Sequence, residues 1–514
     1  MKSGRVSPAD LLGKFLRRTC GADMIAGFGG TMCKLALLCL LAIAPSFSAA
    51  QHYDVVIEGG RVMDPETRLD AVRNVGITNG KIGRITPDRL SGKRVVSATG
   101  LVVAPGFIDL HEHGQDVASQ RVKAFDGVTA ALEMEIGAPD VAEFLKSKEG
   151  RSLIHYGTTA SYVAARARVF GAPLPEGTIL PKSGDATDRT ATTEQIQQMQ
   201  QRLRDQLDAG ALGIGMGIEY APGATRLEVI DIFRLAAERK VPVYTHMRSA
   251  GRIEPNSAIA STEEVIGAAA ITGAALHIVH INSTCLLQSL DCLSLIEGAR
   301  AHGVDVTTEA YPYIAGMTAI NSAVFNPGWR EKLGIDYGNL VIPNTGEHLT
   351  KERFEELHNS NTQQWVLIYA NTQEMIDKII PNPLVMIASD GAVGHPRNAG
   401  TYSRVIAQYV RDKKTLTLME ALRRMTLMPA QMLERSTPAA HKKGRMQEGA
   451  DADIVVFDPQ TISDRSTFEK PMEPSVGVHE LIVNGVLLID QQKMILDVYP
   501  GKAILGPGRS AIVH

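Results

Sequence analysis

Short apolar runs alternate with helix-patterned segments through the middle of the chain. In the helix-patterned segments, such as 193–209 and 227–240, apolar residues recur at the spacing of one helix face. The apolar runs have the length of buried strands and lie at 127–137, 211–218, 241–247, 276–281, 304–310 and 384–390. Strand–helix alternation predicts a parallel sheet. We therefore predict an α/β fold, a TIM-like (β/α)8 barrel with its active site at the C-terminal strand ends.

Both ends of the chain have a different pattern, with short β-strands separated by turn residues. Near the N-terminus these strands are predicted at 53–58, 61–64, 74–77 and 81–85, and near the C-terminus at 452–457 and 479–486. Thr78-Asn79-Gly80 is a hairpin signal between two of them. We predict one small β-sandwich domain built from both termini, residues 51–104 and 442–514, with the barrel at 105–441.

One strand–helix unit, from about 314 to 383, is tens of residues too long for the repeat. Its texture is mixed, and a polar helix is predicted near 350–359. Long insertions at a barrel mouth are often lids or binding loops. We predict an insertion near the barrel mouth, with a surface subdomain as the alternative.

The first fifty residues have the pattern of a signal peptide. Lys34 precedes an apolar run at 35–44, and Ser48-Ala49-Ala50 supplies small residues for cleavage before Gln51. The run is too short to span a bilayer comfortably, although an uncleaved N-terminal anchor is the alternative. We predict export, to a periplasm or as a secreted protein, with no stable membrane insertion after cleavage.

Composition excludes several classes of partner and framework. The 514 residues carry a net charge of −3 and only 5% aromatics, so neither a basic field nor a stacking platform for nucleic acid is present. Three of the five cysteines lie in the first fifty residues. Only Cys285 and Cys292 remain, so the mature protein is not a disulfide scaffold; the two could pair or stay as buried thiols.

His111-Glu112-His113 follows the apolar run 101–110. Residues i and i+2 on a strand share one face, so the two imidazoles point the same way. Two imidazoles on one face at the end of a buried strand predict half of a metal site.

Four further predicted strands carry polar groups at their ends. The strand 127–137 offers Glu133 and Glu135 on one face, and later strands deliver His246, His280 and Asp390. Such a donor set suits zinc or a similar divalent ion. We expect only one of the two glutamates to be a direct ligand and choose Glu135, which lies closer to the strand end; Glu133 is the alternative.

Two other histidines lie near this set. His277 is predicted on the opposite face from His280, as a packed core histidine. His395 lies close to Asp390 in sequence and could line the pocket.

At these residues the chain resembles the amidohydrolase superfamily, and within it the N-acyl-D-amino-acid deacylase (D-aminoacylase) group. The resemblance rests on Pro105-Gly106-Phe107-Ile108-Asp109-Leu110-His111-Glu112-His113, on Thr245-His246-Met247-Arg248 and on Ser389-Asp390-Gly391. Further matching stretches are 210–217, 304–307, 311–313, 400–405 and 449–459. The similarity spans nearly everything after residue 52.

The resemblance implies roles for these residues. His246 and His280 resemble the histidines of a tight zinc site, and His111 and His113 resemble the pair that forms a second site with Asp390. Asp390 also resembles the general base. Where the group commonly has a metal-binding Cys on the second strand, this chain has glutamates. A carboxylate bridging two ions could do similar work, so one or two Zn²⁺ are expected.

Two positions depart from the pattern that holds the substrate carboxylate in D-aminoacylases. The family's Lys after the sixth-strand His is replaced by Asn282, and its Ser after the Tyr-Pro-Tyr turn is replaced by Met317. Tyr311 and Arg397 match the remaining carboxylate-binding positions, and Arg alone can grip a carboxylate with two hydrogen bonds.

The expected activity is deacylation of N-acyl amino acids, with the D configuration preferred. A metal-activated hydroxide would attack the linear amide while Asp390 accepts and returns the proton. A dipeptidase or cyclic-amide hydrolase of the same superfamily is the alternative. Cyclic-amide relatives commonly use a carboxylated Lys on the fourth strand, and 211–218 contains none. A non-catalytic barrel relative should have lost ligands, and here the set is complete.

Overall fold

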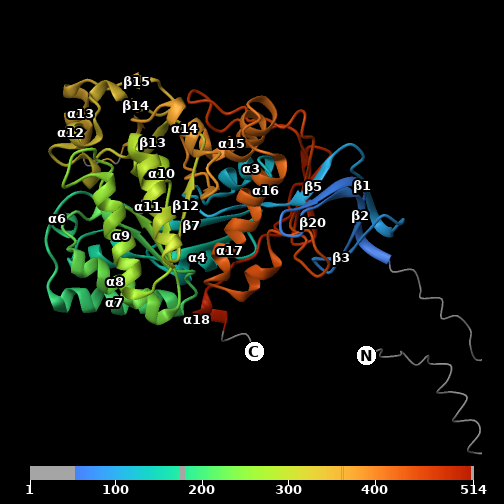
Figure 1. Cartoon of the computed structure of the whole chain (residues 1–514), viewed down its shortest axis with the longest axis horizontal. Helices are drawn as coiled ribbons and strands as arrows, with labels where there is room; N and C mark the ends of the chain where they lie inside the picture. Colours follow the sequence, from blue (N-terminus) through green and yellow to red (C-terminus); the bar gives the residue numbers. More distant parts are fainter. Residues whose placement is uncertain (1–51, 174–179, 361, 363, 511–514) are drawn as a thin grey trace, which may run out of the picture. The chain divides into compact units, whose positions relative to one another are not determined.

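Eight parallel strands form the predicted barrel (Figure 1). In the computed structural model, residues 52–173, 180–360, 362 and 364–510 are described. The strands, in barrel order, are β6 (Phe107–Asp109), β7 (Val128–Ala138), β8 (His155–Ser161), β9 (Ile214–Gly217), β10 (Val243–His246), β11 (Leu276–Ile278), β12 (Val306–Ala310) and β17 (Val385–Ile387). The Ser389 amide donates to Asp109 Oδ1 over 3.0 Å, which joins the last strand to the first.

Strand β8 has no counterpart among the sequence predictions. Its sequence, His-Tyr-Gly-Thr-Thr-Ala-Ser, is fully buried yet almost without large aliphatic residues. Buried parallel strands usually appear as apolar runs in the sequence. In β8 the buried polar side chains include threonines, whose hydroxyls donate hydrogen bonds to β7 carbonyls. Thr158 Oγ1, for example, lies 3.1 Å from the Glu133 carbonyl oxygen.

Helices pack against the barrel strands. The main ones are α3 (Val117–Phe125), α4 (Val141–Lys148), α5 (Tyr162–Val169), α7 (Thr193–Asp208), α8 (Arg226–Arg239), α9 (Ala258–Thr272), α11 (Ser289–Ala301), α15 (Arg397–Arg404) and α17 (Met428–Glu434). Helix α7 begins at a capping box of Thr192 and Gln195. It buries Met199, Leu203 and Leu207, which recur every four residues on one face.

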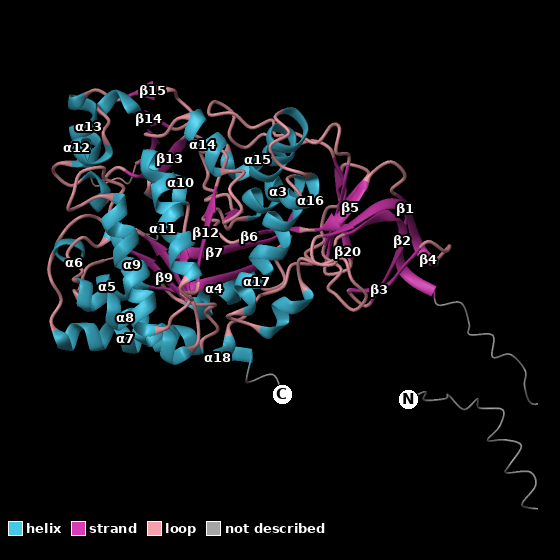
Figure 2. Cartoon of the chain, viewed as in Figure 1, coloured by secondary structure: helices cyan, strands magenta, loops and turns pink. Residues whose placement is uncertain are grey.

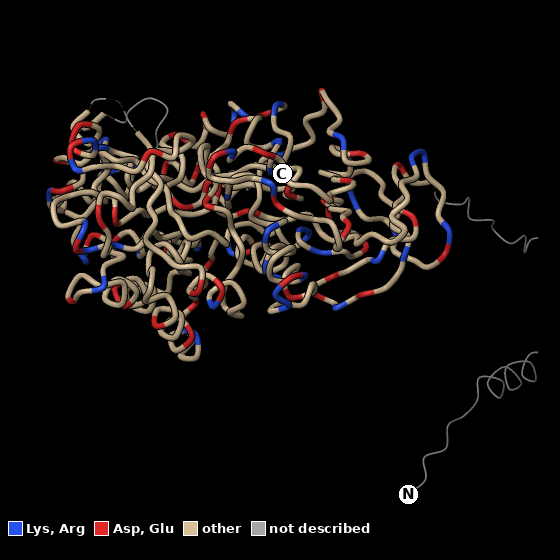
Figure 3. The backbone as a smooth tube through the Cα atoms, turned by 90° about the horizontal axis from the view of Figure 1, so that it is seen from above, with Lys and Arg blue, Asp and Glu red and all other residues tan. Residues whose placement is uncertain are grey.

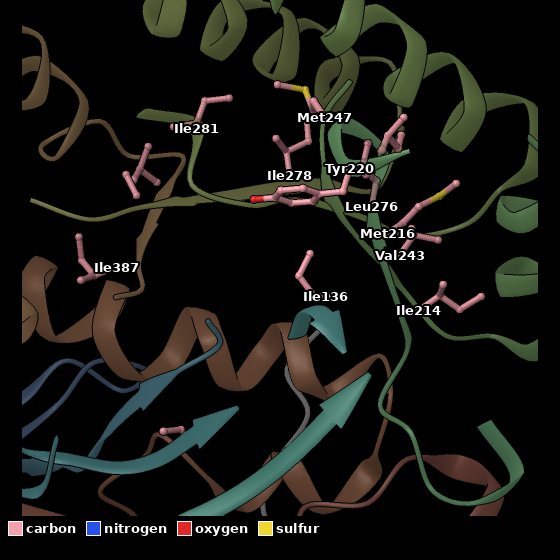
Figure 4. Packing of buried hydrophobic residues seen from close by; sticks show 14 of the residues in the cluster. Ile136, Ile214, Met216, Tyr220, Val243, Met247, Leu276, Ile278, Ile281 and Ile387 are labelled. Carbon is pink, nitrogen blue, oxygen red and sulfur yellow. The ribbon is translucent and has the colours of Figure 1, made fainter. Parts of the chain in front are cut away.

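Alternating strand residues divide the apolar core into two clusters. Ile214, Met216, Val243, Leu276 and Ile278 belong to the larger cluster, which includes helix residues, and Figure 4 shows them close together. The intervening positions contribute to a smaller, separate cluster whose members include Leu132, Met134, Tyr244 and Met386, together with Met432 and Leu433 of helix α17.

Strands from both ends of the chain share one nine-stranded sheet, as the terminal patterns predict (Figure 2). The members are β1 (His52–Asp64), β2 (Leu69–Thr78), β3 (Lys81–Thr86), β4 (Ser91–Ser97), β5 (Val102–Pro105), β18 (Ile454–Phe457), β19 (Val478–Val483), β20 (Val486–Asp490) and β21 (Lys493–Met494). Strand β18 pairs antiparallel with β5, so the C-terminal strands continue the N-terminal part of the sheet.

Two predicted strand boundaries in this sheet are wrong. The predicted strands 53–58 and 61–64 are one strand, β1, with a bulge between Ile57 and Gly60 that lets it pass through the glycine pair. The predicted strand 479–486 is two strands, because Asn484 and Gly485 both adopt positive φ (51° and 77°) and form a hairpin turn.

The overlong segment between β12 and β17 has a sheet of its own, with strand order β13 (Ala315–Ala319), β16 (Trp365–Tyr369), β14 (Leu340–Ile342) and β15 (Glu347–His348). Its short helices include η3 (Ala323–Phe325), α12 (Trp329–Leu333), α13 (Lys351–His358) and α14 (Gln373–Ile379). Phe325, Trp329, Tyr337 and Phe354 pack ring against ring and form its core.

The last described residues leave the nine-stranded sheet and contact the barrel. The Ile504 amide donates to the Tyr156 carbonyl of β8 over 2.8 Å, and the Gly506 amide donates to the Gly210 carbonyl over 2.9 Å. The final part of the range 442–514, ending in α18 (Pro507–Ser510), thus packs on the barrel.

The described residues also bear on the predictions about membrane insertion, surface charge and cysteine pairing. No helix in this part is long and apolar enough to cross a membrane. Charges of both signs are mixed along it (Figure 3). Cys285 and Cys292 are both buried free thiols. The predicted signal peptide, residues 1–50, lies outside the described residues.

A buried ion-pair network joins β8 of the barrel to the C-terminal part of the sheet. The Asp453 carboxylate lies 2.8 Å from His155 Nε2 and 2.7 Å from Lys443 Nζ, and it accepts from the Asn484 amide. Burial alone would raise the pKa of Asp453, but the charges of His155 and Lys443 outweigh burial and hold it well below its usual range.

We expect Asp453→Asn to lower the free energy of unfolding by about 1.5–3 kcal/mol, because it removes the charge that pairs with His155 and one of the two carboxylates that pair with the buried Lys443, the other being Asp451 at 3.0 Å. Urea unfolding at pH 7 measures this, and Asp412→Asn, in an exposed pair with Arg411, should change it by less than about 0.5 kcal/mol. A carboxylate with a depressed pKa stabilises the fold above its unfolded-state pKa. The difference between wild type and variant should therefore shrink as the pH falls below about 4; a difference that grows there would contradict the assignment.

Candidate metal centre

The structure brings together the six side chains that the sequence predicts as metal ligands. They come from the ends of five barrel strands: His111 and His113 after β6, Glu135 in β7, His246 ending β10, His280 after β11 and Asp390 after β17. They form two groups, one of His111, His113, Glu135 and Asp390, the other of Glu135, His246 and His280. Within each group the donor atoms lie within 4.8 Å of one another.

Glu135 belongs to both groups and lies between them. Its Oε1 is 2.5 Å from His246 Nδ1 and 3.0 Å from His280 Nε2. Its Oε2 is 3.1 Å from Nε2 of both His111 and His113. Each carboxylate oxygen thus faces one group of histidines, which is the geometry of a bridging ligand.

Glu133, the alternative to Glu135, lies on the outer side of His113. Its Oε2 is 2.7 Å from His113 Nδ1, the ring nitrogen that points away from Glu135. Its Oε1 accepts from the amides of Ile136 and Gly137 over 3.3 Å. Glu133 therefore orients His113 and stands outside both groups.

Backbone conformation aims two of the ligands. His280 and Asp390 both have positive φ, 28° and 50°, although neither is glycine. Such strained residues persist only where the surroundings enforce them, and they cluster at functional sites. Gly391, the residue after Asp390, packs closely against Glu112. A Cβ at Gly391 would lie 2.1 Å from Glu112 Oε2. Glycine at this position lets the two strand ends approach.

The carboxylates give the centre a negative field. Burial alone would lower the pKa of His111, but Asp390 and Glu135 beside it raise that pKa to about 10. Burial also opposes charge on His246, yet Glu135 and Glu219 raise its pKa to about 9. The site therefore favours positive charge at these two rings, whereas burial lowers the pKa of His280; a divalent cation held by neutral rings would supply positive charge to the whole centre.

A carboxylate behind the ring contacts the second nitrogen of three of the four histidines. Glu309 Oε1 is 2.7 Å from His111 Nδ1, Glu133 is on His113, and Glu219 Oε2 is 2.7 Å from His246 Nε2. Metal-binding histidines usually have such partners, which fix the tautomer and the ring orientation. The fourth, His280, has no hydrogen-bond partner for Nδ1 among the described residues.

Sequence reasoning missed Glu309 and Glu219. A usable signal was present, because each is an acid at or just after the end of an apolar strand run, as Glu135 is. His277 is a buried core histidine, as predicted: it lies 3.0 Å from Glu309 Oε2 and 2.8 Å from Thr307 Oγ1.

A pocket with about 860 Å³ of empty space opens above these ligands. Five of the six ligands line it, all but His111. The segment between β12 and β17 contributes apolar side chains to its wall: Ile314, Met317, Val324, Leu333, Trp365 and Ile368. Among the described lining residues none is Lys or Arg.

The predicted substrate-binding residues lie at different depths. Tyr311 lines the pocket. Arg397 is fully buried beneath it, with its guanidinium carbon 4.5 Å from the Tyr311 ring centre and Nη1 2.9 Å from Asp390 Oδ2. His395, predicted as a pocket residue, lies behind the wall instead, where its Nε2 is 3.0 Å from the Ala315 carbonyl oxygen. The departures Asn282 and Met317 both line the pocket.

The site and fold agree with comparisons to known proteins. An N-acyl-D-glutamate deacylase from Alcaligenes xylosoxydans xylosoxydans is 29% identical over 479 residues, which cover 86% of this chain and 94% of that protein. A D-aminoacylase from the same organism is 28% identical over 486 residues, 87% of this chain and 96% of that protein.

Solved structures show the same architecture. The crystal structure of an N-acyl-D-glutamate deacylase from Bordetella bronchiseptica, complexed with zinc and a phosphonate mimic of the tetrahedral intermediate, has a TM-score of 0.75. It is 26% identical, and the match covers 89% of this chain and 100% of that one. A sequence model of the amidohydrolase family matches residues 102–488. Because this match spans most of the chain, the protein belongs to the amidohydrolase family.

Proposed function

We propose that the protein is a zinc-dependent hydrolase that cleaves the linear amide bond of N-acyl amino acids, with D substrates preferred. The observation that carries the proposal is Glu135, whose two oxygens each face a separate group of histidines. The relatives reported above support the reaction class, because all three are named as deacylases or aminoacylases acting on D compounds.

The donor set fits zinc. Imidazole nitrogens and carboxylate oxygens are its ordinary ligands, and the charge of the ion would balance the negative field of the site. His246, His280 and Glu135 would hold one ion, and His111, His113, Glu135 and Asp390 the other. When bound, zinc polarises a carbonyl oxygen and lowers the pKa of water to about 7.

Asp390 is placed to move the proton in this reaction. Its Oδ2 is paired with Arg397 and its Oδ1 lies 3.4 Å from His111 Nε2 and 3.3 Å from His113 Nε2. Burial opposes its charge, but Arg397 and His111 hold the pKa of Asp390 well below its usual range, so it is ionised at neutral pH. We propose that it takes the proton of the attacking water and returns it to the leaving nitrogen.

Tyr311 is placed to stabilise the oxyanion. Burial raises the pKa of Tyr311 to about 12, so the phenol keeps its proton at neutral pH. Because Tyr311 lines the pocket beside Asp390, its hydroxyl can donate a hydrogen bond to the developing negative charge.

Cyclic-amide hydrolysis fits the site less well. Strand β9, Ile-Gly-Met-Gly, has no lysine to carry a carboxylate bridge, and Glu135 already occupies the position between the two groups. A non-catalytic relative is disfavoured because all six predicted ligands converge.

The pocket wall predicts the substrate side chain. Since the described lining contains no Lys or Arg, a side-chain carboxylate, in addition to the α-carboxylate that every N-acyl amino acid carries, would enter the pocket without a cationic partner, which is costly. We expect N-acetyl-D-leucine or N-acetyl-D-methionine to be hydrolysed with a kcat/KM at least about tenfold above that of N-acetyl-D-glutamate.

The test measures kcat/KM for these compounds, their L enantiomers and dihydroorotate. It uses zinc-loaded protein and protein from which a chelator has removed the metal. We expect turnover of D linear amides that disappears on stripping and returns with Zn²⁺. Turnover of dihydroorotate alone would favour the cyclic-amide alternative, and a preference for N-acetyl-D-glutamate would contradict the side-chain prediction.

A further inference from the structure

Glu219 contacts both a predicted metal ligand and the segment between β12 and β17. It lies in η1 (Ile218–Tyr220), immediately after β9, and is 5% exposed. Its Oε2 is 2.7 Å from His246 Nε2. Its Oε1 forms a short ion pair with Lys332 Nζ of helix α12. One carboxylate thus connects His246 to a helix outside the barrel strands.

The neighbouring residue makes a parallel connection. The Tyr220 ring lies edge-on to the His246 ring, with 5.0 Å between the ring centres. The Tyr220 hydroxyl is 3.2 Å from Thr318 Oγ1 in β13. Both η1 residues that hold His246 therefore also contact the segment that builds the pocket wall.

The other two histidine-orienting carboxylates differ in this respect. Glu133 and Glu309 lie on the barrel strands β7 and β12 themselves. Glu133 bonds to backbone amides of its own strand, and Glu309 bonds to His277 of the adjacent strand β11. Their positions follow from the barrel, whereas the position of Glu219 also depends on Lys332.

Helix α12 is held by aromatic packing and faces the pocket. Trp329 at its start packs against Phe325 and Phe354, with ring centres 5.4 and 5.2 Å apart. Leu333, the residue after Lys332, lines the pocket. The packing that places Leu333 in the pocket wall therefore also places the Lys332 ammonium against Glu219.

We propose that Glu219 is a positioning residue that orients His246 toward the metal, and that Lys332 holds Glu219 in that position. The segment between β12 and β17 then has two roles, because it forms the pocket wall and supports the metal centre. This inference rests on the proposed function, in which His246 binds zinc. The competing explanation is that Glu219 only neutralises Lys332 and stabilises the fold.

The chain offers a matched control for the competing explanation. Glu264, with 4% of its side chain exposed, pairs with the partly buried Arg248 at 2.7 Å, as Glu219 pairs with Lys332, but among the described residues it has no hydrogen bond or ion pair with a predicted ligand. Glu264→Gln therefore removes a buried charge from a comparable ion pair without touching a histidine of the centre.

The experiment compares full-length wild type, Glu219→Gln, Lys332→Met and Glu264→Gln, each stripped and reloaded with Co²⁺. The visible spectrum of bound Co²⁺ reports ligand geometry, and competition with a chromophoric chelator gives its dissociation constant. We expect Glu219→Gln to weaken Co²⁺ binding by about 10- to 100-fold and to shift the spectrum. Lys332→Met should act in the same direction, by roughly 3- to 10-fold, and Glu264→Gln should leave both readouts unchanged.

The outcomes separate the possibilities. The inference is overturned if Glu219→Gln binds Co²⁺ with a dissociation constant within twofold of wild type. It is also overturned if Glu264→Gln weakens Co²⁺ binding as much as Glu219→Gln does. A defect in Glu219→Gln with none in Lys332→Met overturns the role of the β12–β17 segment. If Glu219→Gln does not fold, Lys332→Met is compared with Glu264→Gln: weaker Co²⁺ binding in Lys332→Met alone supports the inference, and equal binding in the two variants overturns it. A wild type that binds no Co²⁺ overturns the proposed function together with the inference.

Discussion

Replacing Asp390 by Asn is expected to lower kcat for amide hydrolysis by about a thousandfold, within the range that a general base contributes. Asparagine has the same shape but cannot accept the proton of the attacking water. The four histidines and Glu135 are untouched, so bound zinc should remain at or above half of the wild-type content. Steady-state kinetics with an N-acyl-D-amino acid and metal analysis of the same sample measure both quantities.

Stability must be measured alongside, because the Asp390→Asn substitution leaves the buried Arg397 without its counter-charge. A matched control is Asp464→Asn, which breaks the partly buried pair of Asp464 with Arg404 at 2.8 Å away from the pocket lining. In the described part of the chain, neither residue of this pair lines the pocket or contacts a predicted ligand, although Arg404 lies over the ring of the lining residue Tyr313, so the control should keep kcat close to the wild-type value. Retained turnover in folded, zinc-loaded Asp390→Asn protein would remove Asp390 from the role of general base.

Replacing Glu135 by Gln is expected to have the largest effect on metal binding. A neutral amide cannot bridge two cations with two anionic oxygens, and the substitution affects both histidine groups at once. We expect zinc affinity to fall by more than about 100-fold, beyond the 10- to 100-fold range typical of residues that only orient a ligand. Zinc content after dialysis against a weak chelator measures the loss.

Glu133→Gln provides the control for Glu135, because it lies on the same strand and the same side of the centre. Among the predicted ligands Glu133 contacts His113, at Nδ1 and from outside the two groups. Zinc affinity should therefore fall by about 10- to 100-fold in Glu133→Gln. Equal losses in the two variants would argue against the bridge, and a larger loss in Glu133→Gln would reverse the two roles.

Most of the barrel follows from local pattern. Parallel strands are covered on both faces, so seven of the eight appear as apolar runs that need no tertiary information. Strand β8 escaped because Thr158 and Thr159 are buried through hydrogen bonds to β7 rather than through hydrophobicity. At the Asn484-Gly485 turn the signal was present in the sequence, and the apolar residues on either side obscured it.

The ligand set was also readable from sequence, since parallel strands deliver their last residues to one end of a barrel. Strand periodicity could not choose between Glu133 and Glu135, because both occupy the same face. The choice depends on the distances to four histidines from three other strand ends. The depth of Arg397 and His395 is likewise a tertiary property, set by packing beneath Tyr311 and Tyr313.

By itself, the sequence determined the fold class, the chemistry of the ligands and their location at strand ends, because these depend on local periodicity and residue type. Only the tertiary structure decided which carboxylate lies between the two histidine groups and which ones stand behind the rings. It also placed Lys332 against Glu219, 113 residues away in sequence. Contacts of that kind depend on how separate segments pack together, and local pattern carries no information about that packing.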